Sequence, residues 1–444
     1  MEKRTMLAAR FRCRRMRLLA RALVFGATFV VANLPAAVIP VTDRNLLNGL
    51  SLNDWVCQVG SINSTVEGAS FKVAFSGTQQ VALQVDNAHL SGLVAARYPI
   101  LAWSVNGGAT QIHQLAAGEM TVSLASFVTN PVVDLYIKGM SPFENRYLGD
   151  VPTNSVKITG LVVDSGGSTA VVALPGKGWL NIGDSIMAGN LAEYSAGQGY
   201  PSNEDDLAAG SASRASYGYL LAQHYGYQET RLAYGGYDWG GGLAGVPALS
   251  TLIEQKTSMI SRLANGLLNP IPDVVLINLG ENGAPALTDV TQALVKLRSR
   301  VSPATKIIVM VPVAGTARTR ISQSFNSYSS ASAETNTLLV DLGAIAYATA
   351  DGQHPTAGGH LAIYRAALPI FNAILGITNQ PVSPPYVQLA VHQTAGNSLQ
   401  LSWPQGILLE ATNLAGPWVT NSTAASPLSV SPIAAQKYYR LRVQ

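Results

Sequence analysis

The sequence predicts an α/β protein in which a parallel sheet, covered by helices on both faces, is preceded by a β-sandwich and followed by a small all-β module. Three observations lead to this prediction. Residues 45–175 contain short runs of alternating apolar and polar residues, residues 176–377 alternate strand-like with helix-like patterns, and a proline-rich stretch at 378–386 precedes the last segment, 387–444. At 444 residues, the chain is also longer than one hydrophobic core usually holds.

The first 37 residues have the pattern of a secretory signal peptide. Eight Lys or Arg and one acid stand here, and the apolar stretch 23–32 ends near the small residues Ala36 and Ala37. A membrane anchor is the alternative, but this stretch has about half of the roughly 20 residues that a spanning helix needs. We therefore expect cleavage, a secreted or periplasmic protein, and no stable membrane anchor.

The charge that remains without this segment gives no indication of a nucleic-acid partner. The remaining chain holds 21 of the 29 basic and 24 of the 25 acidic residues, a net charge of −3. Cys13 lies inside the segment, so Cys57 is left alone, no intrachain disulfide is possible, and we expect Cys57 to be a small core residue.

No cofactor or metal is expected from the sequence. Residues 240–245 match Gly-x-Gly-x-x-Gly, but they continue a glycine-rich loop and lack an acid about twenty residues on that would bind a ribose. Five of the histidines show no metal-ligand spacing: His89, His113, His224, His360 and His392.

The segment before residue 176 is typical of a β-sandwich. Its period-two runs include 70–75, 81–85 and 132–137, and clusters of Gly, Asn and Ser separate such runs at intervals of roughly ten residues.

The segment 176–377 is typical of a parallel sheet with helical crossovers. Strands are expected at 179–184, 231–234, 274–279, 307–313 and 338–341. Helices are expected between them, for example at 217–224 and where apolar residues recur every three or four positions from Leu287 to Val301. In such sheets ligands bind beyond the carboxyl ends of the strands.

Ser185 follows the first of these strands and is the candidate nucleophile. A serine hydroxyl is a weak nucleophile unless a base takes its proton and donors stabilise the resulting oxyanion. The strand-to-helix turn would point the Ser185 N–H at an anion. Taken alone, Ser185 is equally well explained as a helix N-cap.

Two further strand ends carry candidate donors. Gly236 follows the second strand, where a glycine lets a backbone N–H approach a substrate closely. Asn282 follows the third strand and brings a side-chain amide to the same rim. A tight glycine turn and a turn asparagine are the structural alternatives for these two residues.

The base and its acid are expected in one loop near the end of this segment. Asp351 stands three residues before His354, a spacing that lets the carboxylate accept from Nδ1 while Nε2 faces the serine. A chance loop pairing is the alternative, and Asp341 at the end of the fifth strand is a competing acid for which we favour a structural role.

In this order the blocks resemble the SGNH or GDSL-type hydrolase family, over residues 179–376. The matching residues are Gly183-Asp184-Ser185, Gly280-Glu281-Asn282 and Asp351 to Pro355. The resemblance implies a flavodoxin-like domain with Ser185 as nucleophile, His354 as base and Asp351 as its orienting acid. The implied oxyanion hole comprises the N–H groups of Ser185 and Gly236 and the side chain of Asn282.

The chain departs from the family pattern at two positions and by one insertion. The asparagine usual upstream of the block-two glycine is missing, and Gly283 replaces the aspartate that commonly follows Gly-x-Asn. A long segment at 190–213 follows the nucleophile turn, where it could shape the acyl or alcohol pocket.

A β-sandwich directly before such a domain resembles the two-domain arrangement of carbohydrate esterase family 2, whose sandwich is a jelly roll. This resemblance implies a serine esterase that removes acetyl groups from a poly- or oligosaccharide without a cofactor. Trp239 is a candidate for stacking on a sugar ring, although packing is the default role of one aromatic. A general short-chain ester or lipid hydrolase and a non-catalytic carbohydrate-binding or cell-surface protein are the alternatives.

Overall fold

The computed structural model describes residues 36–51, 53–377, 389–394, 398–403, 407–424, 426, 428–431 and 436–442. Ala37–Pro385 form one compact unit, separate from the C-terminal module. The predicted signal segment lies outside the described residues except at its last two positions, and so does the linker 378–386. Within the described ranges, no helix has the length and apolarity needed to cross a membrane.

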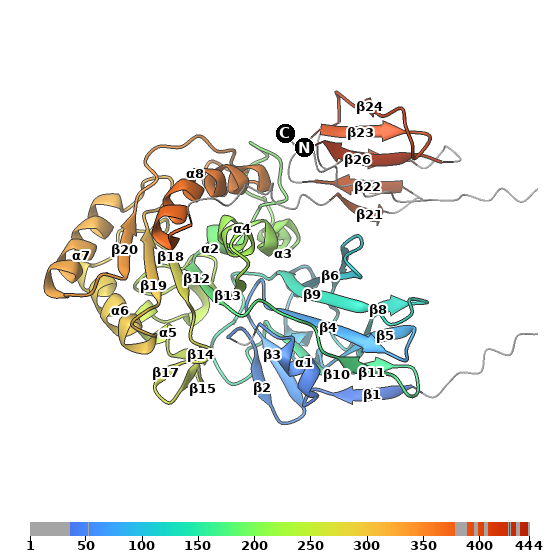
Figure 1. Cartoon of the computed structure of the whole chain (residues 1–444), viewed down its shortest axis with the longest axis horizontal. Coiled ribbons are helices and arrows are strands. Elements are labelled where there is room, and N and C mark those ends of the chain that lie inside the picture. The colour runs from blue at the N-terminus through green and yellow to red at the C-terminus, as the bar shows by residue number, and fades with distance from the viewer. Residues whose placement is uncertain are drawn as a thin grey trace, which may run out of the picture. The chain divides into compact units, whose positions relative to one another are not determined.

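Two antiparallel sheets form the N-terminal β-sandwich (Figure 1). The first has the order β2-β3-β10-β5-β8, with β1 also paired to β10: β1 (Ala37–Pro40), β2 (Val56–Gln58), β3 (Ser61–Ser64), β5 (Gln80–Val85), β8 (Thr121–Ser126) and β10 (Val156–Val163). The second has the order β11-β4-β9-β6-β7: β4 (Ser70–Ser76), β6 (Ile100–Val105), β7 (Gln111–Gln114), β9 (Val132–Gly139) and β11 (Ser168–Ala170). Because β1 belongs to the first sheet, the sandwich begins before the predicted residue 45.

Alternate residues of these strands build the core of the sandwich. Phe71, Val73 and Phe75 of β4 are buried, and so are Val81 and Leu83 of β5, in one apolar cluster. Short helices connect some strands: α1 (Arg44–Asn48), η1 (Ala88–Gly92) and η2 (Ala95–Arg97).

The prediction for Cys57 is wrong. This residue lies on β2, at one edge of the first sheet, and its side chain is exposed rather than packed in the core. In a strand, neighbouring side chains point to opposite faces, so the burial of Val56 leaves Cys57 on the outer face.

Five parallel strands form the sheet of the α/β part, in the order β13-β12-β18-β19-β20. They are β12 (Gly178–Gly183), β13 (Gln228–Ala233), β18 (Val274–Asn278), β19 (Lys306–Met310) and β20 (Thr337–Val340). This order of the first five strands, 2-1-3-4-5, is flavodoxin-like and confirms the predicted class. The order reverses at β12, because the next two strands lie on opposite sides of it, so a ligand is expected at its carboxyl end.

Helices cover both faces of this sheet (Figure 1). One face packs against α5 (Leu249–Leu252), α6 (Leu287–Arg300) and α7 (Arg318–Ala331), and the other against α2 (Ser185–Ala188), α4 (Tyr217–His224) and α8 (Ala357–Leu375). Strand β18 is buried on both sides: Val275 and Ile277 face the first group, and Val274 and Leu276 the second. Such continuous burial explains why this strand is an unbroken apolar run in the sequence.

The remaining elements of this unit are short. The segment 190–213 contains η3 (Glu204–Asp206) and α3 (Leu207–Gly210) and leads into η4 (Ser213–Ala215). After β13 come η5 (Leu243–Gly245) and two small hairpins, β14 (Gln255–Thr257) with β15 (Ile260–Ser261) and β16 (Leu263–Ala264) with β17 (Leu267–Leu268).

The C-terminal module is all-β, as predicted. Its antiparallel sheets have the orders β21-β22-β25 and β24-β23-β26: β21 (Ala390–Thr394), β22 (Ser398–Ser402), β23 (Ile407–Ala411), β24 (Val419–Thr420), β25 (Leu428–Val430) and β26 (Tyr438–Arg442). Leu401, Trp403 and Leu408 are the buried residues of its small core.

Candidate active site

Ser185 opens a helix of a single turn at the carboxyl end of β12. The N-cap of this helix is Asp184, whose carboxylate oxygen Oδ1 accepts from the Ile186 N–H at 2.9 Å. Ser185 is therefore not the cap, which removes the structural alternative for it. Its hydroxyl is left available for another partner, in a side chain that is 7% exposed.

That partner is His354, which lies 169 residues further along the chain. The distance from Ser185 Oγ to His354 Nε2 is 2.9 Å, and the distance from His354 Nδ1 to Asp351 Oδ2 is 2.8 Å. An ionised carboxylate only accepts hydrogen bonds, so Nδ1 carries the proton and Nε2 accepts from the hydroxyl. The structure thus brings together the three residues that the sequence suggested as nucleophile, base and acid.

The Asp351 carboxylate is held by its own loop. Its Oδ1 accepts from the backbone N–H groups of Gln353 at 3.0 Å and His354 at 2.7 Å. Burial pushes the pKa of Asp351 upward, but these N–H donors and the imidazole outweigh it and hold this pKa below its usual value. The competing acid Asp341 is engaged elsewhere, because its Oδ2 accepts from Arg318 Nη1 at 2.7 Å.

Gly236 lies in a tight turn directly after β13. The Tyr237 N–H donates to the Tyr234 carbonyl at 3.2 Å, and Gly236 has a φ of 68°, a value that favours glycine. The Tyr234 N–H donates to the carbonyl of Gly183 at 3.3 Å. The turn is therefore joined to the last residue of β12, immediately before the nucleophile turn.

Asn282 lies on the other side of the nucleophile turn, in the loop after β18. Its Nδ2 donates to the Tyr237 carbonyl at 3.0 Å and lies 3.5 Å from Asp184 Oδ2. Of its two N–H donors, only the one directed at Tyr237 has a bond of ordinary length. Ser185, Gly236 and Asn282 thus come from three adjacent strand ends that are joined to one another.

The carboxyl group of Asp184 is fully buried between Ser185 and Asn282. Burial raises the pKa of Asp184 to about 8, with further contributions from the nearby carboxylates of Glu281 and Asp238. The buried position thus disfavours the charged form of this group, while the Ile186 N–H that it accepts from favours it.

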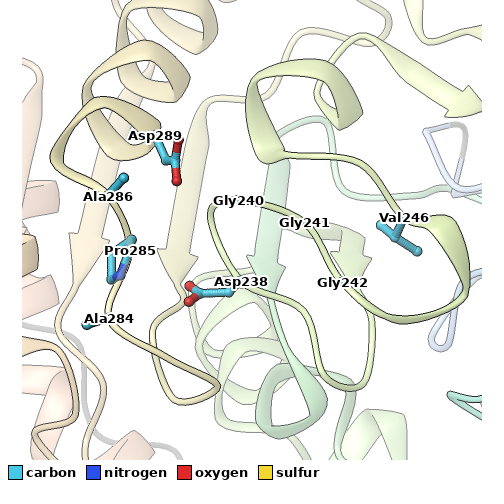
Figure 2. Close-up of a pocket in the computed structure, with 9 residues that line it drawn as sticks. All are labelled: Asp238, Gly240, Gly241, Gly242, Val246, Ala284, Pro285, Ala286 and Asp289. Atoms are coloured by element: carbon cyan, nitrogen blue, oxygen red, sulfur yellow. The ribbon is translucent and has the colours of Figure 1, made fainter.

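A pocket of about 480 Å³ opens between the loop that follows β13 and the loop that follows β18 (Figure 2). It is lined by Asp238, Gly240, Gly241, Gly242 and Val246 on one side and by Ala284, Pro285, Ala286 and Asp289 on the other. Burial and the carboxylate of Asp289 raise the pKa of Asp238 to about 6. The pocket therefore offers a ligand two carboxyl groups and the backbone of three glycines.

The segment 190–213 forms another border of the site. The N–H groups of Gly197 and Gly199 donate to the carbonyls of Thr349 and Ala350 at 3.0 and 2.7 Å, just before the loop of Asp351. Tyr200 follows, with a side chain 45% exposed and a ring centroid 6.3 Å from that of the His354 imidazole. The segment thus places an accessible aromatic ring beside the histidine.

The same segment is also fixed to the β-sandwich. Lys138 Nζ, on β9, donates to the carbonyl of Ser211 at 2.6 Å and to that of Ala209 at 2.9 Å, and Arg97 forms an ion pair with Asp205. The sequence left the role of this segment open, and the structure shows it bridging the sandwich and the histidine loop.

The structure corrects the interpretation of Trp239 as a sugar-stacking residue. Its side chain is 1% exposed and belongs to the core, and its Nε1 donates to the Leu279 carbonyl at 3.2 Å. A ring whose faces are covered cannot stack on a substrate, so the packing alternative is correct.

Two residues at the site were missed by the sequence reasoning. Asp184 carried a signal, since an acid directly before a helix start is a preferred N-cap. Tyr200 carried none, because its position beside His354 depends on how a long segment folds back. Among the described residues, no group of three or more His, Cys, Asp or Glu side chains could hold a metal ion.

No protein-family model and no curated protein matches the chain, but solved structures do. A family two carbohydrate esterase from Cellvibrio japonicus matches 77% of this chain and 99% of its own, with a TM-score of 0.61 and 16% identity. The acetyl xylan esterase Est2A from the rumen bacterium Butyrivibrio proteoclasticus matches 78% and 100%, with a TM-score of 0.60 and 16% identity. A family two carbohydrate esterase from Clostridium thermocellum in complex with cellohexaose matches 73% and 98%, with a TM-score of 0.58 and 16% identity. Over most of its length, this chain has the SGNH-type fold of the family two carbohydrate esterases.

Proposed function

We propose that this protein is a secreted serine esterase that removes O-acetyl groups from carbohydrate through an acyl intermediate on Ser185. The observation that carries the proposal is the continuous hydrogen-bonded chain from Ser185 Oγ through His354 to Asp351, with links of 2.9 and 2.8 Å. Such a chain turns a weak hydroxyl nucleophile into an effective one. The basic and apolar pattern of residues 1–37 supports secretion.

Acylation begins when Ser185 Oγ attacks the ester carbonyl carbon. His354 Nε2 takes the hydroxyl proton as the new C–O bond forms, and the Asp351 carboxylate stabilises the resulting imidazolium. The tetrahedral intermediate then collapses as the imidazolium gives its proton to the leaving sugar oxygen. The acetyl group remains on Ser185 as an ester.

The negative charge on the carbonyl oxygen needs donors that are already in place. The Ser185 N–H, the Gly236 N–H and the side-chain amide of Asn282 are the three groups we assign to this task. The turn containing Gly236 is joined to the end of β12, and Asn282 is joined to that turn, so the three groups share one framework. A framework of this kind needs little reorganisation when charge develops.

Deacylation repeats the same steps with water in place of the serine. His354 Nε2 takes a proton from water, the oxygen attacks the acetyl carbonyl, and the imidazolium then protonates Ser185 Oγ. Acetate leaves, and the free enzyme returns.

Three features support a carbohydrate substrate. The pocket between the loops after β13 and β18 offers the carboxylates of Asp238 and Asp289, which can accept hydrogen bonds from sugar hydroxyl groups. Tyr200 presents an accessible ring beside His354, and aromatic faces pack well against the apolar faces of sugars. The structures with the same fold include an acetyl xylan esterase and a complex with cellohexaose.

The experiment that tests this proposal compares substrates. Turnover of acetylated xylan and of an acetylated xylo-oligosaccharide is measured against that of aryl esters with acyl chains of increasing length. We expect acetyl esters to be preferred and the acetylated carbohydrate to have the higher kcat/KM. A preference for acyl chains beyond butyrate would favour a general ester or lipid hydrolase. Carbohydrate binding with no turnover of any ester would favour a non-catalytic binding protein.

A further inference from the structure

The nucleophile helix α2 is too short to hold its own position. It has four residues, Ser185–Ala188, and a helix of one turn is unstable unless other contacts stabilise it. The position of Ser185 relative to His354 therefore depends on what binds the backbone groups of α2.

The first two carbonyls of α2 are satisfied locally. The Asn190 N–H donates to the Ser185 carbonyl at 2.9 Å, and the Gly189 N–H donates to the Ile186 carbonyl at 3.1 Å. Gly189 has a φ of 80°, so this is the left-handed closure that commonly ends a helix.

The last two carbonyls are bound by one buried side chain from the neighbouring strand β13. Arg231 Nη1 donates to the Met187 carbonyl at 3.1 Å and lies 3.4 Å from that of Ala188. The same guanidinium donates from Nε to Glu229 at 2.7 Å and from Nη2 to the Ser216 hydroxyl at 3.1 Å. All three nitrogens of a fully buried, planar group are thus used, which fixes where the carbonyls of α2 lie.

The β-sandwich covers this guanidinium and holds the strand that carries it. The Arg231 N–H donates to Asp54 Oδ1 at 2.8 Å. Gly68 lies so close above the guanidinium that a Cβ on it would be 3.2 Å from the Arg231 Cζ. Asp54 lies just before β2, and Gly68 lies between β3 and β4 of the sandwich.

A second link runs to Ser185 from the connection between β3 and β4. Glu67 Oε1 accepts from Asn190 Nδ2 at 3.2 Å, and the backbone N–H of Asn190 is the donor to the Ser185 carbonyl. Glu67 is itself fixed by Arg146 at 3.1 Å and by the Met140 N–H at 3.0 Å. The sandwich therefore reaches α2 by two independent routes, through Arg231 and through Asn190.

We propose that Arg231 is a positioning residue for Ser185. We also propose that the β-sandwich helps to position Ser185 through its contacts with Arg231 and Asn190, and is not a separable binding module. Arg231 touches no reacting atom. It acts by fixing the helix whose first residue is the nucleophile, so its loss displaces Ser185 Oγ from His354 Nε2. This inference rests on the proposed function, since it assumes that Ser185 is the nucleophile.

The test measures the rate at which a fluorophosphonate probe labels Ser185 in the full chain, alongside Tm. Lysine keeps the charge in Arg231→Lys, but its one ammonium nitrogen cannot take the positions of the three guanidinium nitrogens that bond Glu229, Ser216 and the carbonyls of α2. We expect the labelling rate and the kcat for an acetyl ester to fall about tenfold to hundredfold, as a misplaced nucleophile requires, with KM changed by less than about threefold.

Arg262→Lys is the matched control. Arg262 is also fully buried where the α/β part meets the sandwich, and it donates to the carbonyls of Asn53 and Gln255, but none of its bonds reaches α2. We expect a similar loss of Tm with a labelling rate within about twofold of the wild type, since a stability effect alone leaves the folded site intact.

The outcomes separate the two proposals. If the folded wild type is not labelled, the proposed function fails and this inference fails with it. If the wild type is labelled and Arg231→Lys is labelled equally fast, or if Arg262→Lys slows as much as Arg231→Lys, only the inference is overturned. Should Arg231→Lys not fold, Glu229→Gln weakens the charged partner of Nε, and we expect labelling to slow about fivefold. An unchanged rate in that variant would also overturn the inference.

Discussion

Ser185 and His354 meet in one hydrogen bond but belong to two segments that are built differently. In the histidine loop, the acid and the base are held to each other by residues within a few positions: Asp351 accepts from the N–H groups of Gln353 and His354 and from the His354 ring. The nucleophile turn is held by residues far away in sequence, including Asp54 and Arg231. One side of the site is thus a local motif, and the other depends on the assembly of sandwich and sheet.

This difference predicts how each side responds to change. A local motif keeps its geometry whenever its own loop folds, so substitutions there affect the chemistry directly. The position of a nucleophile on a one-turn helix changes whenever a distant contact is lost, so substitutions in the sandwich also reach the reaction.

The largest effect is expected where the two sides meet. Ser185→Ala removes the proposed nucleophile and His354→Ala the proposed base, so each should lower kcat for an acetyl ester by about 10⁴-fold or more. Because the residues act as a unit, the double variant should be little worse than either single one. Steady-state kinetics on purified, folded variants checks this, and additive losses in the double variant would contradict a shared step.

The next largest effect is expected on the histidine side. In Asp351→Asn the amide would favour the wrong imidazole tautomer, so we expect kcat to fall about a thousandfold with little change in KM. The comparison between the two sides predicts that the backbone of the Ser185 turn is unchanged in this variant, since the bonds lost are local to the histidine loop. A fall of less than about fivefold would mean that another group orients the ring.

An intermediate effect is expected for the donor from the third strand end. Asn282→Ala should lower kcat by about a hundredfold, the usual cost of one oxyanion donor, with KM nearly unchanged. Asn282→Asp provides a second measure, because it keeps the size of the side chain but places a negative charge where an oxyanion would form. Neutral kinetics in Asn282→Ala would remove this residue from the oxyanion hole.

The two sides should also respond to pH with opposite sign. Burial and the carboxylate of Glu229 raise the pKa of Asp54 to about 7, so the folded chain keeps a proton there that the unfolded chain releases. The stability that Asp54 contributes is therefore lost as pH rises from about 4 to about 7. The pKa of Asp351 is lowered instead, so the stability that it contributes is lost as pH falls.

Urea unfolding of the wild type and of Asp54→Asn at several pH values tests this sign. Asparagine does not titrate, so Asp54→Asn does not lose stability at this position as pH rises. The unfolding free energy of Asp54→Asn minus that of the wild type should therefore increase by on the order of 1–4 kcal/mol from about pH 5 to pH 8. For Asp351→Asn, the unfolding free energy of the variant minus that of the wild type should instead decrease as pH rises through the acid range, because only the wild type gains stability from the ionised Asp351. Parallel pH profiles for the two variants would contradict the contrast between the two sides.

The smallest effect is expected at the border formed by residues 190–213. Tyr200→Ala should raise KM for an acetylated xylo-oligosaccharide about fivefold to tenfold, and more than KM for ethyl acetate, because only the sugar can stack on the ring. Tyr200→Phe keeps the ring and should restore the KM for the oligosaccharide. If both variants behaved alike, the aromatic face would not contribute to binding.

The same contrast explains how much of the site could be predicted from the sequence. The histidine loop could be predicted because Asp351 and His354 are three residues apart. The five strands could be predicted because buried parallel strands are continuous apolar runs. Ser185 was ambiguous by itself, and the structure resolved it by showing Asp184 as the cap.

Contacts over long sequence distances could not be predicted in this way. Nothing in the sequence joins Asp54 or Glu67 to the turn at Ser185, and nothing places Tyr200 beside His354. The candidate role of Trp239 in sugar stacking was wrong because its position after Gly236 does not show whether the ring is covered, and the prediction for Cys57 was wrong because this residue lies on the outer face of β2.

The most direct test of the acyl-serine mechanism is to trap the intermediate. The protein is mixed with an acetylated xylo-oligosaccharide, quenched in acid within the first turnover, and its peptides are analysed by mass spectrometry. The mechanism predicts an acetyl group on Ser185 in the wild type, and none in Ser185→Ala. Acetate release by Ser185→Ala at the wild-type rate, or rapid turnover in the wild type with the acetyl group on another residue, would contradict it.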